Sequence, residues 1–194
     1  VLIERRTLPE ADRRAKVDEL HDLIRAIRAC PVPVIAAVRG GAAGAGASLA
    51  LACDFIVAET GAMFTAAYVK AGLVPDAGLT ASLARLLPRP LAMEMCLLAR
   101  PVASDRLLSL GVVNVAAPPD LVVSEAHVIA DALAAGPRAA QGAIRALVAA
   151  AYNQSEAAQL DAERDAMAHA AGALVDHRGP HRRRRARGTG RRRG

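Results

Sequence analysis

A glycine-rich stretch between two apolar runs constrains this chain more than any other feature. Residues 33–54 read PVIAAVRGGAAGAGASLALACD, in which Val34–Val38 gives way to four glycines and then to Ala47–Ala52. The first run is bounded by Pro33 and Gly40 and predicts a buried strand, whereas the Ala- and Leu-rich second run predicts a helix. Glycines before a helix let a ligand approach the backbone and present free N–H groups to negative charge. The same glycines also allow close helix–strand packing, and these residues alone leave both interpretations open.

The rest of the chain alternates short strands and helices, which predicts an α/β fold. Residues 1–12 contain no recognisable element. We expect a core over 13–136, a helical C-terminal region over 137–176 and a disordered Arg-rich tail over 177–194. The apolar spacing and the breakers predict helices over 13–30, 80–87, 91–99, 104–111, 121–135, 138–152 and 155–174, and strands over 54–59, 63–64 and 112–115.

The net charge of +6 belongs to the C-terminus. Nine of the 25 Lys and Arg residues lie between His177 and Gly194, so 16 basic residues oppose 19 acidic ones in the rest of the chain, a net charge of −3. A run this poor in apolar residues buries too little surface to offset its ordering entropy, which predicts disorder. Arginine runs also bind phosphate, but no aromatic residue accompanies this one, so nucleic-acid binding is not favoured.

The sequence lacks the patterns typical of membrane, secreted and metal-binding proteins. The apolar segments are broken before they reach the length of a membrane span, and the start has no signal-peptide pattern. Cys30, Cys53 and Cys96 are isolated, and the five histidines have no ligand spacing. We therefore expect a cytoplasmic protein with no metal site and no membrane partner. His21 lies inside the predicted helix 13–30 and is interpreted as a surface or packing histidine.

One carboxylate stands in a turn-rich segment of the core. Residues 72–80 read GLVPDAGLT, in which Asp76 lies between a proline and a glycine. This pattern is ordinary turn chemistry, so the residues alone indicate a turn former.

Three segments taken together resemble the crotonase (enoyl-CoA hydratase/isomerase) superfamily. They are PVIAAVRGGAAGAGASLALACDFIVAE, then FTAAYVKAGLVPDAGLT with LARLLP, and then LGVVNVA, and the resemblance runs over about residues 13–178. It implies a crotonase-like spiral of ββα turns, partial here, with a helical C-terminal part, assembled as trimers or paired trimers. It also implies an acyl-CoA thioester as the substrate, with coenzyme A as part of that substrate and no separate cofactor, in fatty acid metabolism or phenylacetate degradation.

The resemblance assigns site residues by position. The backbone N–H of Ala45, between Gly44 and Gly46, corresponds to a family oxyanion-hole donor. The two positions at which hydratases carry glutamates hold Ser48 and Tyr68. Neither side chain shuttles protons near neutral pH at its ordinary pKa, so a two-carboxylate hydratase mechanism is not supported. We expect these two residues and the two glycines to contact the substrate.

Asp76 matches the position at which isomerase-like members carry an acid/base aspartate, among them dienoyl-CoA and ring-epoxide phenylacetyl-CoA isomerases. An isomerase needs only one carboxylate, which removes a proton beside the enolate and returns it elsewhere. The resemblance therefore favours isomerisation of a double bond or ring epoxide in a CoA thioester, with an oxyanion-stabilised enolate. The plain turn residue stays the alternative role for Asp76.

The sequence departs from the family pattern at both ends. The first strands, the adenine-contacting loop and an A-G-x-D-L stretch with the first oxyanion N–H are not found, so we expect an N-terminally truncated member with one donor of two. A non-catalytic pseudoenzyme or assembly partner is the alternative, and polyanion binding by the tail is less favoured. Asp176-His177-Arg178 matches a family D-H-R-E-G, after which the Arg-rich run begins. We interpret that run as a shifted reading frame, which predicts an apolar segment with a Phe and a basic end in another frame.

Overall fold

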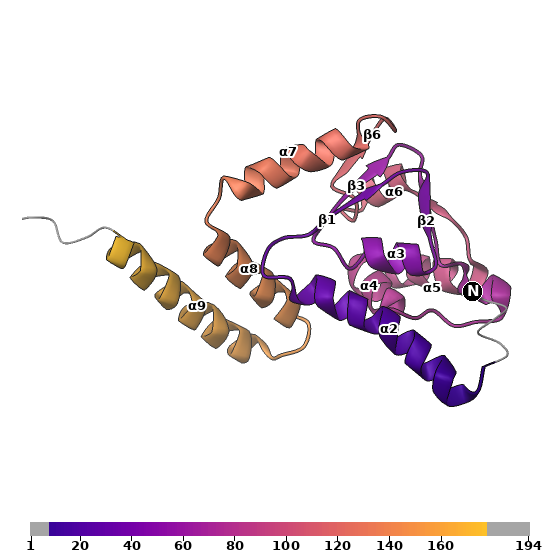
Figure 1. Ribbon diagram of the computed structural model, residues 1–194, viewed down its shortest axis with the longest axis horizontal. Helices are drawn as coiled ribbons and strands as arrows, with labels where there is room; N and C mark the ends of the chain where they lie inside the picture. Colours follow the sequence, from indigo (N-terminus) through magenta and orange to yellow (C-terminus); the bar gives the residue numbers. More distant parts are fainter. Residues whose placement is uncertain (1–7, 178–194) are drawn as a thin grey trace, which may run out of the picture. The chain divides into compact units, whose positions relative to one another are not determined.

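The computed structural model describes residues 8–177, and its contacts divide the chain after Gly142 into two compact units. The first unit contains both β-sheets, and the second contains the C-terminal helices (Figure 1). The boundary falls inside helix α8 (Arg138–Ala150). The first unit extends beyond residue 136 because α8 begins against it: a Cβ added to Gly142 would lie 2.9 Å from the Pro31 carbonyl oxygen.

The first sheet consists of three parallel strands in the order β1-β3-β6. These strands are β1 (Ile35–Val38), β3 (Phe55–Glu59) and β6 (Val115–Ala117). Helix α7 (Val122–Ala134) packs against all three strands (Figure 1). Val57 and Val122 are completely buried in this contact, as expected for parallel strands covered by a helix.

The second sheet pairs β2 (Gly41–Ala43) in parallel with β4 (Met63–Thr65), which pairs antiparallel with β5 (Val102–Ala103). Gly41 is required where β2 crosses β4, because an added Cβ would lie 2.7 Å from the Met63 carbonyl oxygen. Neither β2 nor β5 was predicted, since the Gly and Ala of β2 lack the β-branched residues that identify a strand and β5 is only two residues long.

The main core lies between this second sheet and the helices that surround it. These helices are α3 (Ala45–Ala50), α4 (Leu79–Leu86), α5 (Arg89–Leu98) and α6 (Ser104–Ser109). Phe64 is the largest fully buried side chain and packs in one cluster with Leu79, Leu83, Met95 and Leu107. The core is otherwise aliphatic, in agreement with an aromatic content of 2%.

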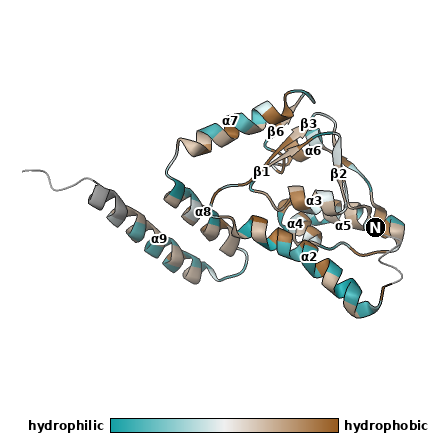
Figure 2. Ribbon diagram, viewed as in Figure 1, coloured by the Kyte–Doolittle hydropathy of each residue, from teal (hydrophilic) through white to brown (hydrophobic). Residues whose placement is uncertain are grey.

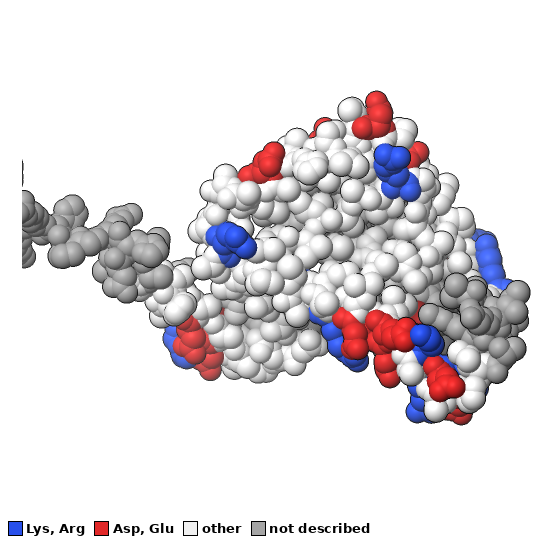
Figure 3. Space-filling model, viewed as in Figure 1, with Lys and Arg blue, Asp and Glu red and all other residues white. Residues whose placement is uncertain are grey.

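Helix α2 (Glu10–Ala29) is bound to the core by one apolar face. Leu20, Ile24 and Ile27 cluster with residues of the core, and polar and apolar residues alternate along the ribbon (Figure 2). Acidic and basic side chains gather over the exposed face of α2, whereas most of the surface seen in the same view is uncharged (Figure 3). The charged face includes exposed ion pairs such as Arg14–Glu10, each worth at most about 1 kcal/mol, so the apolar face holds this helix.

The second unit contains the end of α8 and helix α9 (Glu156–His177). Inside this unit, the Gln159 side chain donates a hydrogen bond of 3.3 Å to the Leu147 carbonyl. Several apolar side chains of these helices are exposed, among them Ile144, Val148 and Leu160. Among the described helices, none is both long and apolar enough to pass through a bilayer.

The predicted α/β fold with a helical C-terminal part is confirmed, with three local differences besides the two strands that were not predicted. Helix α2 begins at Glu10, so the last three residues of the segment expected to be irregular are helical. Strand β6 begins at Val115 rather than residue 112, because the N–H groups of Val112 and Val113 both donate to the Leu107 carbonyl in a turn after α6. The short helix η1 (Ala67–Ala71) was not predicted. The expected tail, apart from His177 at the end of α9, lies outside the described residues.

Candidate active site

The glycine-rich turn opens helix α3 with a backbone that only glycine adopts readily. Gly44 has φ 54° and ψ −122°, and its N–H donates to the Thr65 carbonyl at the end of β4. Ala45 is the first residue of α3, so its N–H has no acceptor within the helix. Gly46 is exposed, and a Cβ added there would meet nothing within 4 Å. The start of α3 therefore presents backbone N–H groups beside open space.

Three predicted site residues meet next to this turn. The Tyr68 hydroxyl, on η1, donates a hydrogen bond of 2.7 Å to Oδ1 of Asp76. Ser48 Oγ, in the first turn of α3, lies 3.5 Å from the Tyr68 oxygen and 3.3 Å from the Asp76 carbonyl oxygen. Ser48 is 1% exposed, while Tyr68 and Asp76 are half-buried. The fold thus joins three segments that lie as far as 28 residues apart.

The direction of these hydrogen bonds follows from the number of protons. The Tyr68 hydroxyl has one proton, which it gives to Asp76, so its oxygen can accept from Ser48. The Ser48 hydroxyl also lies 3.3 Å from the Gly44 carbonyl, its alternative acceptor one turn back in α3. The Asp76 carboxylate therefore accepts the Tyr68 proton, while the single Ser48 proton has three acceptors in reach, the Tyr68 hydroxyl oxygen and the Gly44 and Asp76 carbonyl oxygens.

Burial raises the pKa of Tyr68 to about 12, and the neighbouring Asp76 contributes in the same direction. The Ser48 hydrogen bond lowers this pKa and only partly offsets the increase. Tyr68 consequently keeps its proton at neutral pH and acts as a hydrogen-bond donor. It does not have the properties of a general base.

The segment that contains Asp76 is a tight turn. The Asp76 carbonyl accepts from Leu79 N–H at 3.1 Å, and the two residues between them, Ala77 and Gly78, have φ of 53° and 73°. Two left-handed central residues are typical of a type I′ turn. The sequence-based interpretation of Asp76 as a turn residue thus describes its backbone, while its side chain is bound separately by Tyr68.

Helix α2 holds this turn from the other side. The Ala77 N–H donates to Nε2 of His21 at 3.2 Å, and Arg28 donates to the Ser82 hydroxyl at 3.1 Å. Sequence reasoning did not assign His21 to the site. The available signal was its position next to Leu20 on the apolar face of the helix, where a polar side chain needs a partner.

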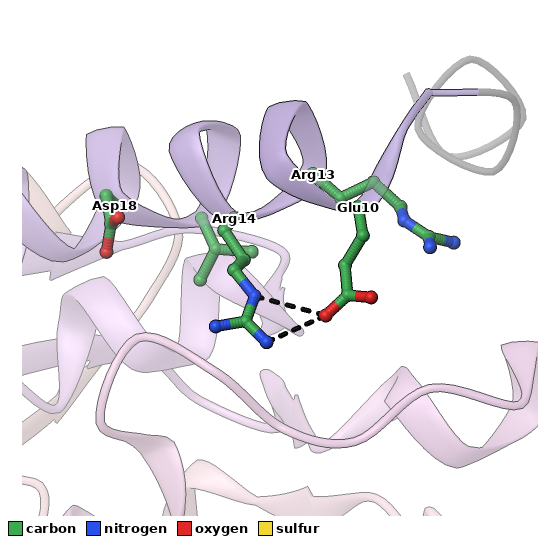
Figure 4. A pocket seen from close by; sticks show the side chains of 5 residues that line it. Glu10, Arg13, Arg14 and Asp18 are labelled. Atoms are coloured by element: carbon green, nitrogen blue, oxygen red, sulfur yellow. Dashed lines mark hydrogen bonds and ion pairs between the residues drawn. The ribbon is translucent and has the colours of Figure 1, made fainter.

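Other charged groups of the described chain lie outside this cluster. Glu59 accepts from the Gly40 N–H at 2.6 Å, and Glu94 pairs with Arg100. Over residues 8–177 no three His, Cys, Asp or Glu side chains group as metal ligands. An open hollow of about 590 Å³ lies against the first turns of α2 and contains no predicted site residue (Figure 4). It is lined by Glu10, Arg13, Arg14, Val17 and Asp18.

Comparison with known proteins relates the chain to one family. The family model described as enoyl-CoA hydratase/isomerase matches residues 4–183. A probable enoyl-CoA hydratase of Rhodobacter capsulatus is 41% identical over 148 residues, which cover 75% of this chain and 57% of that protein. The 1,2-epoxyphenylacetyl-CoA isomerase of Escherichia coli is 35% identical over 173 residues, 89% of this chain and 66% of that protein.

The fold agrees with solved structures as well. The crystal structure of an enoyl-CoA hydratase from Polaromonas sp. JS666 superimposes with a TM-score of 0.82 at 43% identity, covering 86% of this chain and 65% of that one. The crotonase-like fold expected from the sequence is thereby confirmed. The chain spans 57% to 66% of the length of these relatives.

Proposed function

Because this chain belongs to the enoyl-CoA hydratase/isomerase family, we propose that it binds an acyl-CoA thioester and isomerises it through an enolate. The isomerisation moves a double bond or rearranges a ring epoxide. The observation that carries the proposal is the Asp76 carboxylate, held by the Tyr68 hydroxyl beside the first turn of α3.

The backbone N–H of Ala45 is the proposed oxyanion donor. It stands at the start of α3 next to the exposed Gly46, where a thioester carbonyl can approach without meeting a side chain. Negative charge develops on that carbonyl oxygen as the enolate forms, and a donor aimed at it stabilises the transition state. Removal of one such donor typically costs about 2.7–4 kcal/mol of barrier.

Asp76 is the proposed acid/base group. Its carboxylate takes a proton from the carbon beside the thioester carbonyl, and the same proton returns to another carbon of the acyl chain. Tyr68 donates to Oδ1, and the described residues supply no donor to Oδ2, which remains available for the substrate. The proton is conserved over the cycle, so this isomerisation needs no further acid and no co-reactant.

Hydration is less well supported by the same residues. It requires acid/base groups that position and deprotonate water, whereas the two corresponding positions hold Ser48 and Tyr68. The Tyr68 phenol, with a pKa raised to about 12, keeps its proton at neutral pH. The likeness to the E. coli epoxide isomerase favours the proposal, and the likeness to the probable hydratase of R. capsulatus makes hydration the competing activity.

The decisive experiment measures both reactions on one preparation. A β,γ-unsaturated acyl-CoA reports isomerisation, and crotonyl-CoA reports hydration. We expect isomerisation to exceed hydration and to fall by about 10²–10⁴ in Asp76→Asn, since general acid/base catalysis contributes that much. The matched control is Asp120→Asn, which changes an exposed aspartate of the loop before α7. Full activity in Asp76→Asn, or rapid hydration of crotonyl-CoA, would overturn the proposal.

We also propose that the chain self-associates, as the family resemblance led us to expect. Val74 is 81% exposed, and Leu97 and Leu98 are each 59% exposed, so apolar side chains near the Asp76 turn and at the end of α5 lack cover in the single chain. Light scattering coupled to size-exclusion chromatography should give a mass of three or six chains. A monomer at micromolar concentration would contradict this proposal.

A further inference from the structure

We propose that His21 is a positioning residue for Asp76, because its imidazole accepts the hydrogen bond that holds the turn next to the carboxylate. The inference deepens the proposed function and rests on it for the activity measurements alone. His21 has no assigned role in the sequence pattern, and the structure links it to the site through one hydrogen bond.

The hydrogen bond joins the helix to the peptide unit that follows Asp76. Nε2 of His21 lies 3.2 Å from the backbone nitrogen of Ala77, a residue that is only 1% exposed. The carbonyl oxygen of the same peptide unit accepts from Leu79 N–H and lies 3.3 Å from Ser48 Oγ. Both ends of the Asp76–Ala77 peptide are therefore held, one by α2 and the other by α3 and α4.

The backbone at Ala77 needs such support. Its φ of 53° lies in the left-handed region, which is unfavourable for a residue with a Cβ. Strained backbone of this kind persists only when the surroundings hold it. Here the Ala77 methyl packs with Ile24 and Ala52, and its N–H is bound by His21. Loss of the hydrogen bond leaves a buried N–H without its acceptor at a strained residue, and the Asp76 turn loosens.

The hydrogen bond requires the neutral imidazole. Nε2 accepts here, so the ring proton of neutral His21 is on Nδ1, and an imidazolium has no acceptor left. The turn therefore depends on an acceptor atom at this position, which a substitution of His21 can remove.

The charged groups around His21 come mostly from its own helix. The six-residue helix α3, which reaches this cluster through Leu49, has no charged side chain. Within four residues of His21, α2 carries Asp18, Glu19, Asp22 and Arg25, while the turn carries Asp76 and α4 carries Arg85. Asp22 pairs with Arg25, Glu19 pairs with Lys16, and the Asp76 carboxylate is bound by Tyr68.

Three variants test whether the acceptor holds the turn. His21→Gln retains an acceptor oxygen near the place of Nε2. His21→Leu removes the acceptor. His127→Gln, on the exposed side of α7, is the matched control for the loss of a histidine.

The primary measurement is nitrogen-15 NMR of the whole 194-residue chain, in the wild type and in each variant under the same conditions. In the wild type, we expect the His21 ring nitrogens to report the Nδ1–H tautomer. The hydrogen-exchange protection of the Ala77 amide should fall about five- to tenfold in His21→Leu, the size expected for one lost hydrogen bond. The protection should stay close to the wild-type value in His21→Gln and in His127→Gln.

Isomerase activity provides the second measurement. His21→Leu should lose kcat by about tenfold with little change in KM, because a misplaced base slows the chemical step more than binding. His21→Gln and His127→Gln should keep kcat close to the wild-type value. An Ala77 amide with wild-type protection in His21→Leu, or a His21→Gln variant that loses as much kcat as His21→Leu, would overturn the inference. If the amide responds as expected but Asp76→Asn remains fully active, the proposed function fails and the dependence of the turn on His21 stands.

Discussion

The Tyr68 hydroxyl donates a hydrogen bond of 2.7 Å to the carboxylate of Asp76, eight residues further along the chain. By position, the family resemblance places Tyr68 where hydratases carry a glutamate. In the folded chain the phenol faces the single carboxylate of the cluster, orients it and keeps its own proton. A tyrosine donor at this position, in place of a second carboxylic acid, therefore favours a reaction that needs one carboxylate.

Tyr68 should ionise only at strongly alkaline pH, because burial and Asp76 raise its pKa to about 12. The pKa in the folded chain lies above the ordinary value of about 10, so the contribution of this phenol to stability is complete below about pH 10 and is lost as pH rises toward 12. The chain contains two tyrosines, Tyr68 and the exposed Tyr152. Tyrosinate absorbance should show a late transition that Tyr68→Phe removes. A variant that retains this transition would refute the assignment.

The Tyr68→Phe variant should also test the orienting role. It keeps the ring and removes only the donor to Asp76, so we expect kcat for isomerisation to fall about ten- to hundredfold with a small change in KM. Tyr152→Phe, the matched control, should behave as the wild type. Ser48→Ala should cost less than Tyr68→Phe, since Ser48 reaches the carboxylate only through the Tyr68 oxygen. Equal losses of kcat in Ser48→Ala and Tyr68→Phe would argue against this order.

Gly41, in β2, and Gly46, in α3, should respond oppositely to substitution by alanine. In Gly46→Ala the new methyl meets no atom within 4 Å and lies inside α3, so stability should rise by about 0.5–1 kcal/mol. If the open space beside Ala45 receives the thioester, this variant should nevertheless bind acyl-CoA more weakly. Gly41→Ala should lose about 1–3 kcal/mol, because its Cβ would lie 2.7 Å from the Met63 carbonyl. Urea denaturation measures the changes in stability, and titration calorimetry measures the affinity for acyl-CoA. Unchanged affinity in Gly46→Ala would show that the thioester binds somewhere other than beside Ala45.

Asn114 should contribute to stability as an extra partner of β3. Its side-chain oxygen accepts from Ile56 N–H and its own N–H donates to the Ile56 carbonyl, both at 2.8 Å. Asn114→Ala leaves the Ile56 N–H without its acceptor inside the sheet, and we expect a loss of about 1–3 kcal/mol in urea denaturation. Asn114→Asp keeps an acceptor oxygen and should lose less. Equal losses of stability in Asn114→Ala and Asn114→Asp would show that the side-chain amide nitrogen, not the oxygen, matters.

Local pattern was sufficient for the elements whose residues repeat with a clear period. The apolar positions of α2 and α7, and the β-branched run that becomes β1, identify their structure because a buried helix face and a buried strand each demand one spacing. The same criterion failed for Val112 and Val113, which have the composition of a strand but donate both N–H groups to Leu107. It also failed for β2, where close approach to β4 selects glycine.

The sequence by itself determined the α/β class and, through its resemblance to a family, the positions of Ala45, Ser48, Tyr68 and Asp76. Only the tertiary structure decided what those side chains do. Hydrogen bonds between residues 20 to 56 apart leave no local period, so the pairing of Ser48 with Tyr68 and the bond from Ala77 to His21 cannot be seen in any window of sequence. The strained turn at Ala77 likewise depends on packing from α2 and α3, since nothing in its own dipeptide favours a left-handed alanine.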